Sequence, residues 1–114
     1  MPYIKATTSL ALTEEKKREL KEDFGKLIEI IPGKTEKWLM VAVDDGVYTA
    51  FAGEDASPAA MIEVDLLGAA STEVYASLTE AICKKVAERL GIDGTRIYVK
   101  YKEFSVWGYN GFNF

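Results

Sequence analysis

The second residue of the chain is a proline, and the residues after it, Tyr3 to Thr8, are typical of a β-strand. Removal of the initiator Met1, which is usual before a small residue or proline, would leave the secondary amine of Pro2 at the head of a buried strand. Burial disfavours the charged form of an amine, so this group is a candidate base or nucleophile near neutral pH. The sequence has no histidine and one cysteine, Cys83, and therefore few other candidates. The alternative is that Pro2 is merely tolerated at this position.

The length and composition indicate one globular domain, residues 1–114, with 48% hydrophobic and 28% charged residues. A net charge of −4 argues against a general nucleic-acid binder, because a phosphate backbone requires a basic surface. No apolar run is long enough for a membrane span, and no signal peptide is recognisable. Cys83 cannot form an internal disulfide, which favours a reducing compartment. We therefore expect a cytoplasmic protein without a cofactor or metal; export by a leaderless route is the alternative.

Hydrophobic periodicity predicts the same three elements in each half of the chain. Each half has a strand, then a helix with a Thr or Ser N-cap that ends at a glycine, then a second strand. A short further strand is expected at Val47–Phe51, and the tail Phe104–Phe114 is rich in aromatic residues and glycine. The predicted ranges are Pro2–Thr8, Glu14–Ile31 and Trp38–Val43 in the first half, and Ala60–Leu67 and Thr95–Tyr101 for the strands of the second. The helix of the second half is capped by Ser71 or Thr72 and runs through Leu90 to its end at Gly91.

The two halves, residues 2–57 and 58–114, match in pattern at an offset of 58, which relates Gly33 to Gly91. This predicts an α/β (α+β) fold of two β-α-β units. Right-handed crossovers make the strands within each unit parallel, so the units should form a four-stranded mixed sheet with both helices on one face. The strand Trp38–Val43 is apolar on both sides, so we expect the bare face to be apolar and to be covered by other copies of the chain.

Five short motifs occur in the order and at the spacing of one known family. They are Met1-Pro2, Gly33-Lys34, Leu67-Gly68, Arg96-Ile97-Tyr98 and Trp107-Gly108-Tyr109-Asn110-Gly111. With them, the whole chain resembles the macrophage migration inhibitory factor family of the tautomerase superfamily. The resemblance implies a homotrimer whose sheets form a central barrel, with active sites at the subunit interfaces. It also implies keto–enol tautomerase activity on phenylpyruvate-like or dopachrome-like aromatic acids.

The resemblance also implies a role for individual residues. Pro2 matches the catalytic proline, Lys34 the lysine that binds the substrate carboxylate, and Leu67 a position whose backbone contributes to the site. Tyr98 matches a tyrosine that a neighbouring subunit places beside the substrate. Lys100 replaces an asparagine of the family and adds a positive charge. Aromatic positions around the mouth of the pocket are matched by Trp38, Trp107, Tyr109 and Phe114.

Each of these residues also has a simpler interpretation. Lys34 could be a solvated loop lysine, Tyr98 an ordinary strand aromatic, and the tail aromatics part of a trimer interface. Lys100 could extend into solvent and have no role.

Two other functions stay open for the chain as a whole. One is a secreted, cytokine-like protein that binds a host receptor. The other is hydration or dehalogenation of small acids; relatives with this chemistry use arginines, and none of the three here, Arg18, Arg89 and Arg96, is at a matching position. The Cys-x-x-Cys motif of the mammalian cytokine is absent, so we expect no thiol oxidoreductase activity.

Overall fold

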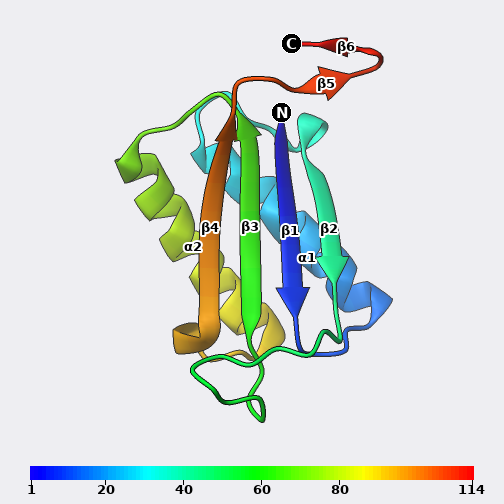
Figure 1. Cartoon of the computed structure of the whole chain (residues 1–114), viewed down its shortest axis with the longest axis vertical. Coiled ribbons are helices and arrows are strands. Elements are labelled where there is room, and N and C mark those ends of the chain that lie inside the picture. Colours follow the sequence, from blue (N-terminus) through cyan, green and yellow to red (C-terminus); the bar gives the residue numbers. More distant parts are fainter.

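Two antiparallel strands, β1 (Pro2–Thr8) and β3 (Ala60–Leu67), form the centre of a four-stranded sheet in the computed structural model, which describes residues 1–114. β2 (Met40–Asp44) runs parallel to β1 at one edge, and β4 (Ile97–Phe104) runs parallel to β3 at the other. The strand order is therefore β2-β1-β3-β4 (Figure 1). This arrangement confirms the two predicted β-α-β units and the mixed sheet.

Both long helices, α1 (Glu14–Leu27) and α2 (Thr72–Leu90), lie on the same face of the sheet (Figure 1). The side chains of Thr13 and Ser71 accept hydrogen bonds from the first turns of α1 and α2, as expected of N-caps. The shorter elements are three 3₁₀ turns and a terminal hairpin: η1 (Ile28–Ile30), η2 (Glu36–Trp38), η3 (Gly94–Arg96), β5 (Gly108–Tyr109) and β6 (Phe112–Asn113).

The strand register is the same in the two units. Tyr3 lies opposite Met40 in the first unit, and adding 58 to each number gives the pair Met61 and Tyr98, which lie opposite each other in the second. The turns η2 and η3, which precede the edge strands, are related by the same offset. Each edge strand is therefore entered through an equivalent turn.

The hydrophobic core lies between the sheet and the helices. Alternate residues of β1 and β3 are buried against the helices, in the pattern that strand geometry requires. They pack on apolar residues of α1 and α2, among them Leu20, Phe24, Leu78, Ile82 and Val86. Arg89 of α2 joins the helices, because its guanidinium donates to both carboxylate oxygens of Asp23 at 2.9 and 3.0 Å. The core thus holds the two central strands and the start of the chain in place.

The predicted starts of both edge strands were wrong. Trp38 belongs to the 3₁₀ turn η2 and not to a strand, because the amides of Trp38 and Leu39 donate to the carbonyls of Thr35 and Glu36, and the chain enters β2 only at Met40. The Glu36 side chain lies against Gly25 of α1. The edge strand of the second unit starts at Ile97 and not at Thr95, because Thr95 lies within the turn η3.

The segment Val47–Phe51 is not a strand of the sheet. The Val47 amide donates to the Thr8 carbonyl at 3.0 Å, but the chain then leaves the sheet, and Phe51 forms an isolated bridge with Glu54 in the same loop. β2 is the edge strand and ends at Asp44, so no strand lies beside this segment to pair with it.

The face of the sheet away from the helices is open within one chain, as expected, but it is not uniformly apolar. Met40, Tyr3 and Asp65 form one row across β2, β1 and β3, and Lys5, Glu63 and Lys100 form another across β1, β3 and β4. The prediction of an apolar face rested on β2, whereas the central strands place their charged residues there. Any partner on this face must therefore accommodate charges as well as apolar groups.

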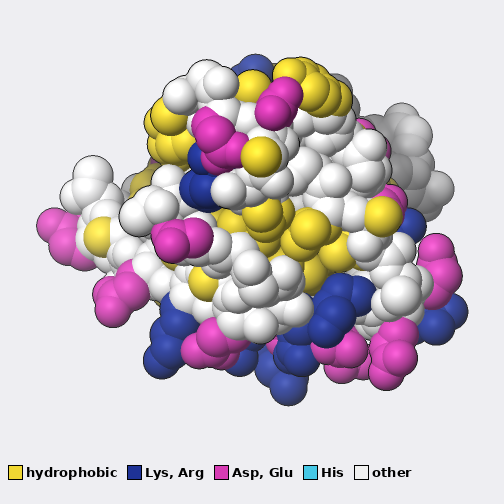
Figure 2. Space-filling view, turned by 90° about the horizontal axis from the view of Figure 1, so that it is seen from below, with side chains coloured by type: hydrophobic (Ala, Val, Ile, Leu, Met, Phe, Trp, Pro, Cys, Tyr) yellow, Lys and Arg dark blue, Asp and Glu magenta, His cyan; other side chains and the backbone are white.

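Charged residues of both signs also mix on the outside of the molecule. Viewed along the sheet from the loop end, Lys and Arg side chains alternate with Asp and Glu along one margin, and hydrophobic side chains occupy the centre (Figure 2). The opposite margin mixes hydrophobic side chains with acidic and basic ones. Because positive and negative side chains are interspersed, the charged margin does not form a uniformly positive or negative surface. Neither long helix has the length and apolar character that crossing a membrane requires.

Candidate active site

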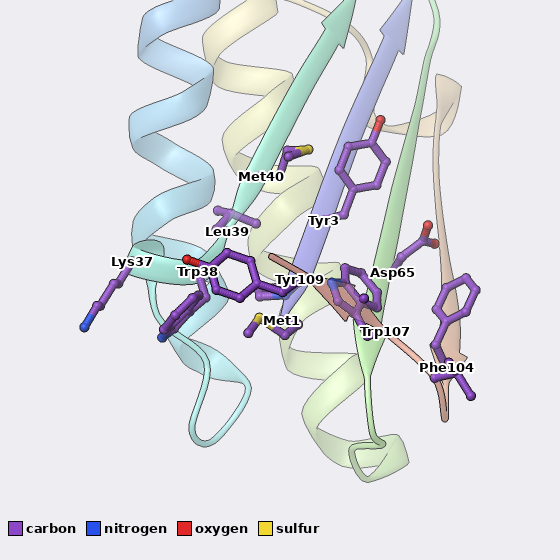
Figure 3. Close-up of a pocket in the computed structure, with 13 residues that line it drawn as sticks. Met1, Tyr3, Lys37, Trp38, Leu39, Met40, Asp65, Phe104, Trp107 and Tyr109 are labelled. Atoms are coloured by element: carbon purple, nitrogen blue, oxygen red, sulfur yellow. The ribbon is translucent and has the colours of Figure 1, made fainter. Parts of the chain in front are cut away.

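A hollow of about 780 Å³ lies at the end of the sheet where the chain begins. Its wall combines the heads of β1 and β2, the turn η2, the end of β4 and the start of the terminal hairpin. The lining residues are Met1, Pro2, Tyr3, Lys37, Trp38, Leu39, Met40, Asp65, Phe104, Val106, Trp107, Gly108 and Tyr109. In Figure 3, Trp38, Tyr109 and Trp107 lie around Met1 at the head of β1. The hollow is thus mainly hydrophobic, with five aromatic side chains, and suited to a flat apolar ligand.

The start of the chain is fixed at the inner end of this hollow. Pro2 is buried and lies opposite Leu66, and the Leu67 amide donates to the Met1 carbonyl at 3.0 Å. Burial, and then the positive charge and hydrogen bond of Lys34, lower the pKa of the Met1 amine below its ordinary value. An amine at the head of β1 is therefore favoured in its neutral, basic form.

Lys34 reaches this end of the sheet because the chain turns back after α1. Gly33 adopts a φ of 80°, a left-handed conformation that a residue with a side chain rarely adopts, and so allows the turn. The Lys34 ammonium donates to the Leu67 carbonyl at 2.9 Å. The structure thereby brings Pro2, Lys34 and Leu67 together, although Lys34 lies 33 residues from Leu67 in the sequence.

The tail aromatics form a connected group over the hollow. The ring of Trp38 contacts that of Tyr109 edge-on at 5.4 Å between centroids, and Phe114 stacks on Tyr109 at 5.9 Å. The Phe114 amide donates to the Trp107 carbonyl, which closes the hairpin. Trp38, Trp107 and Tyr109 line the hollow, whereas Phe114 lies behind Tyr109 and supports it.

Tyr98 and Lys100 lie away from this hollow. Tyr98 is opposite Met61, near the start of β3, whereas Pro2 is opposite Leu66, near its end. Lys100 lies on the open face and forms an ion pair with Glu63 at 3.3 Å. One chain therefore holds only part of the set of residues that the resemblance implies.

Sequence reasoning missed two charged residues of the hollow, Lys37 and Asp65. Lys37 lies over the Trp38 ring at 5.5 Å and extends away from the aromatic group (Figure 3). Asp65 lies opposite Tyr3 on the open face, and strand alternation could have placed it there once the register was known. No group of three His, Cys, Asp or Glu side chains is arranged to hold a metal ion.

Comparisons with known proteins agree with this geometry. A family model described as Macrophage migration inhibitory factor (MIF) matches residues 1–114. A macrophage migration inhibitory factor homolog from Trichuris trichiura is 34% identical over 91 residues, which are 78% of this chain and 79% of the relative.

Solved structures of related proteins superpose closely on the chain. MIF2 of Leishmania major is 31% identical, with a TM-score of 0.92 over 100% of this chain and 97% of that one. A homologue from Prochlorococcus marinus is 27% identical, with a TM-score of 0.81 over 98% of both chains. Together with the family match over the full length, these relatives show that the chain belongs to the macrophage migration inhibitory factor family of the tautomerase superfamily.

Proposed function

We propose that the protein is a keto–enol tautomerase of phenylpyruvate-like or dopachrome-like aromatic carboxylates, with the amine of Pro2 as general acid and base. The observation that carries this proposal is the position of the start of β1. It lies in a mainly hydrophobic hollow, where burial, and then the charge and hydrogen bond of Lys34, lower the pKa of the Met1 amine. Removal of Met1 would transfer these conditions to Pro2. The family membership supports the same chemistry.

The proposed reaction needs one proton removed from carbon and one delivered to oxygen. The Pro2 nitrogen takes a proton from the carbon beside the keto group, and the electron pair of the broken C–H bond forms the carbon–carbon double bond. Negative charge develops on the keto oxygen, which then takes the proton from the Pro2 nitrogen, so that the enol forms and the amine becomes neutral again. Lys34 holds the carboxylate, and its charge stabilises the enolate as it forms. A single amine with a pKa near the working pH can serve both steps.

The experiment that tests this function is the turnover of phenylpyruvate by the purified chain that begins at Pro2. The expected result is saturable tautomerisation that is lost when Pro2 is altered. A chain with the correct mass that does not accelerate phenylpyruvate, p-hydroxyphenylpyruvate or a dopachrome ester above the buffer rate would refute the proposal.

The proposal includes a homotrimer, in which the open sheet faces form a barrel and a neighbour supplies Tyr98 and Lys100 to the hollow. Two features support it: the open face of the sheet, and the distance along β3 between Pro2 and Tyr98. We expect sedimentation at micromolar concentration to give about three times the chain mass of 12.6 kDa. A stable monomer under these conditions would contradict both the barrel and the shared site.

Lys100 provides a test of the shared site. A neighbour's Lys100 near Pro2 would disfavour protonation of the amine, so Lys100→Asn should move the acid limb of the kcat/KM profile to higher pH. The shift should be small, because the Glu63 carboxylate lies 3.3 Å from the Lys100 ammonium and offsets part of its charge. If neither Lys100→Asn nor Glu63→Gln moves the acid limb, Lys100 does not lie near the Pro2 amine and is not part of the active site.

A second candidate function is a cytokine-like protein that binds a host receptor. The observation that favours it is the exposed aromatic group of the terminal hairpin, where Tyr109, Phe112 and Phe114 are each about half exposed. Binding of a receptor by a trimer with Pro2 inactivated would show that this role is independent of catalysis. If Phe112→Ser no longer binds the receptor but still turns over substrate, the receptor-binding surface includes the terminal hairpin.

A further inference from the structure

A mostly buried arginine, Arg96, fixes the loop at the far end of the sheet from Pro2. The Arg96 side chain is 13% exposed, and its guanidinium donates to the backbone carbonyls of Phe51, Glu54, Ser57 and Pro58 at 3.0 to 3.3 Å. It also forms an ion pair with the Glu54 carboxylate at 3.2 Å. Four carbonyls on one guanidinium use nearly its whole donor capacity. The loop that leads into β3 is thereby fixed to the start of β4.

This arginine also fixes two aromatic rings. Its guanidinium carbon lies 5.4 Å from the centroid of the Phe51 ring, and Phe51 in turn packs on the ring of Tyr98 at 4.7 Å, with an angle of 54° between the rings. Tyr98 is nevertheless 57% exposed. The Phe51 contact restricts the conformations of the Tyr98 ring in the free chain. Less conformational entropy is then lost when the exposed side of the ring contacts a ligand or a neighbouring chain, which favours binding there.

We infer that Arg96 and Phe51 are positioning residues for the tautomerase: together they hold the ring of Tyr98 where it completes the active site of a neighbouring copy. This inference rests on the proposed function, in which the neighbour's Tyr98 lies beside the substrate. The aromatic contact sets the tilt of the Tyr98 ring, and the guanidinium sets the position of Phe51. A small displacement of a substrate-positioning group has a large effect on binding and rate, so the loop should influence kinetics at a site that it does not touch.

The inference predicts a change in KM more than in kcat. Tyr98 would contact bound substrate, whereas the proton transfer uses the Pro2 amine, which lies at the other end of the sheet from Phe51 within one chain. Phe51→Leu keeps an apolar side chain in the loop but removes the ring contact with Tyr98. We expect it to raise KM for phenylpyruvate by about fivefold, to leave kcat within about twofold, and to leave the acid limb of the pH profile in place.

A double-mutant cycle separates positioning from a general effect on folding. Tyr98→Leu alone should raise KM at least as much as Phe51→Leu, and the double variant should show no further rise. Arg96→Lys, which keeps the charge but loses the planar guanidinium fork, should give a smaller rise in KM than Phe51→Leu. The matched control is Tyr48→Leu in the same loop: Tyr48 is 80% exposed and donates to Asp55 instead, so KM should not change.

The outcomes distinguish this inference from the proposed function. If Phe51→Leu raises KM as much in the Tyr98→Leu background as in the parent chain, Phe51 does not act through Tyr98 and the inference is wrong. The inference is also wrong if KM does not change in Phe51→Leu, or if Tyr48→Leu raises KM as much as Phe51→Leu does. A parent chain that begins at Pro2 and turns over no substrate overturns the proposed function, and the inference that rests on it.

Discussion

A chain that keeps Met1 is expected to lose at least about a hundredfold in kcat/KM for phenylpyruvate relative to the chain that begins at Pro2, since a positioned general base contributes roughly 10²–10⁴-fold. With Met1 attached, the Pro2 nitrogen is part of an amide and cannot accept a proton. The structure shows that Met1 fits: its carbonyl accepts a hydrogen bond from Leu67 at 3.0 Å. The loss should therefore occur without unfolding.

Two matched variants identify the amine as the cause. One alanine inserted between Met1 and Pro2 leaves a terminal amine but displaces it along the strand direction, so it should be about as inactive as the chain that keeps Met1. Pro2→Gly keeps the amine near its place but changes its basicity, and should lose most but not all of the activity. Intact mass must show the first residue of each sample. Full activity in a sample that still carries Met1 would contradict the mechanism.

Lys34→Gln is expected to raise KM for phenylpyruvate by about tenfold or more and to move the acid limb of the kcat/KM profile to higher pH. The first effect follows from loss of the cation that pairs with the substrate carboxylate. The second follows from the sign of the charge: Lys34 lowers the pKa of the terminal amine, so its removal raises that pKa, and the amine becomes a free base only at higher pH. The measurement is the pH profile of kcat/KM for both proteins.

Lys37→Gln is the matched control for this prediction. Lys37 lines the hollow and carries the same charge as Lys34, but it lies over the Trp38 ring and extends away from the terminal amine. Its removal should change KM only slightly and leave the acid limb in place. Equal shifts in the two variants would show that the general field of the hollow, and not the position of Lys34, sets the pKa.

The fold could be predicted from the sequence because its signals are local. The caps Thr13 and Ser71, the helical periodicity and the glycines that end the helices occur within a few residues of the features that they specify. The offset of 58 then indicated two equivalent β-α-β units, and right-handed crossovers make the strands within each unit parallel. The turns η2 and η3 and the loop after Val47 were missed, because they depend on contacts distant in sequence, such as Glu36 over Gly25 and the hydrogen bonds of Arg96.

The candidate site was less accessible to sequence reasoning alone. Pro2 could be singled out by its chemistry, but nothing local indicates that Lys34 donates to Leu67, and that grouping came from the resemblance to a family. Asp65 and Lys37 were missed because a charged residue in a strand or turn usually indicates only a solvated position. The contact of Phe51 with Tyr98 joins a loop to the start of a strand and has no sequence signature.

The most direct test of the central claim is an NMR titration of the Pro2 amine in protein labelled with ¹⁵N-proline. The sequence has three prolines, and the nitrogens of Pro32 and Pro58 are amides that do not titrate, so one signal reports the base. The account predicts a pKa below that of an unstructured peptide with the same first residues, equal to the kinetic acid limb and raised in Lys34→Gln. A pKa equal to that of the peptide, or one that differs from the kinetic limb, would contradict it.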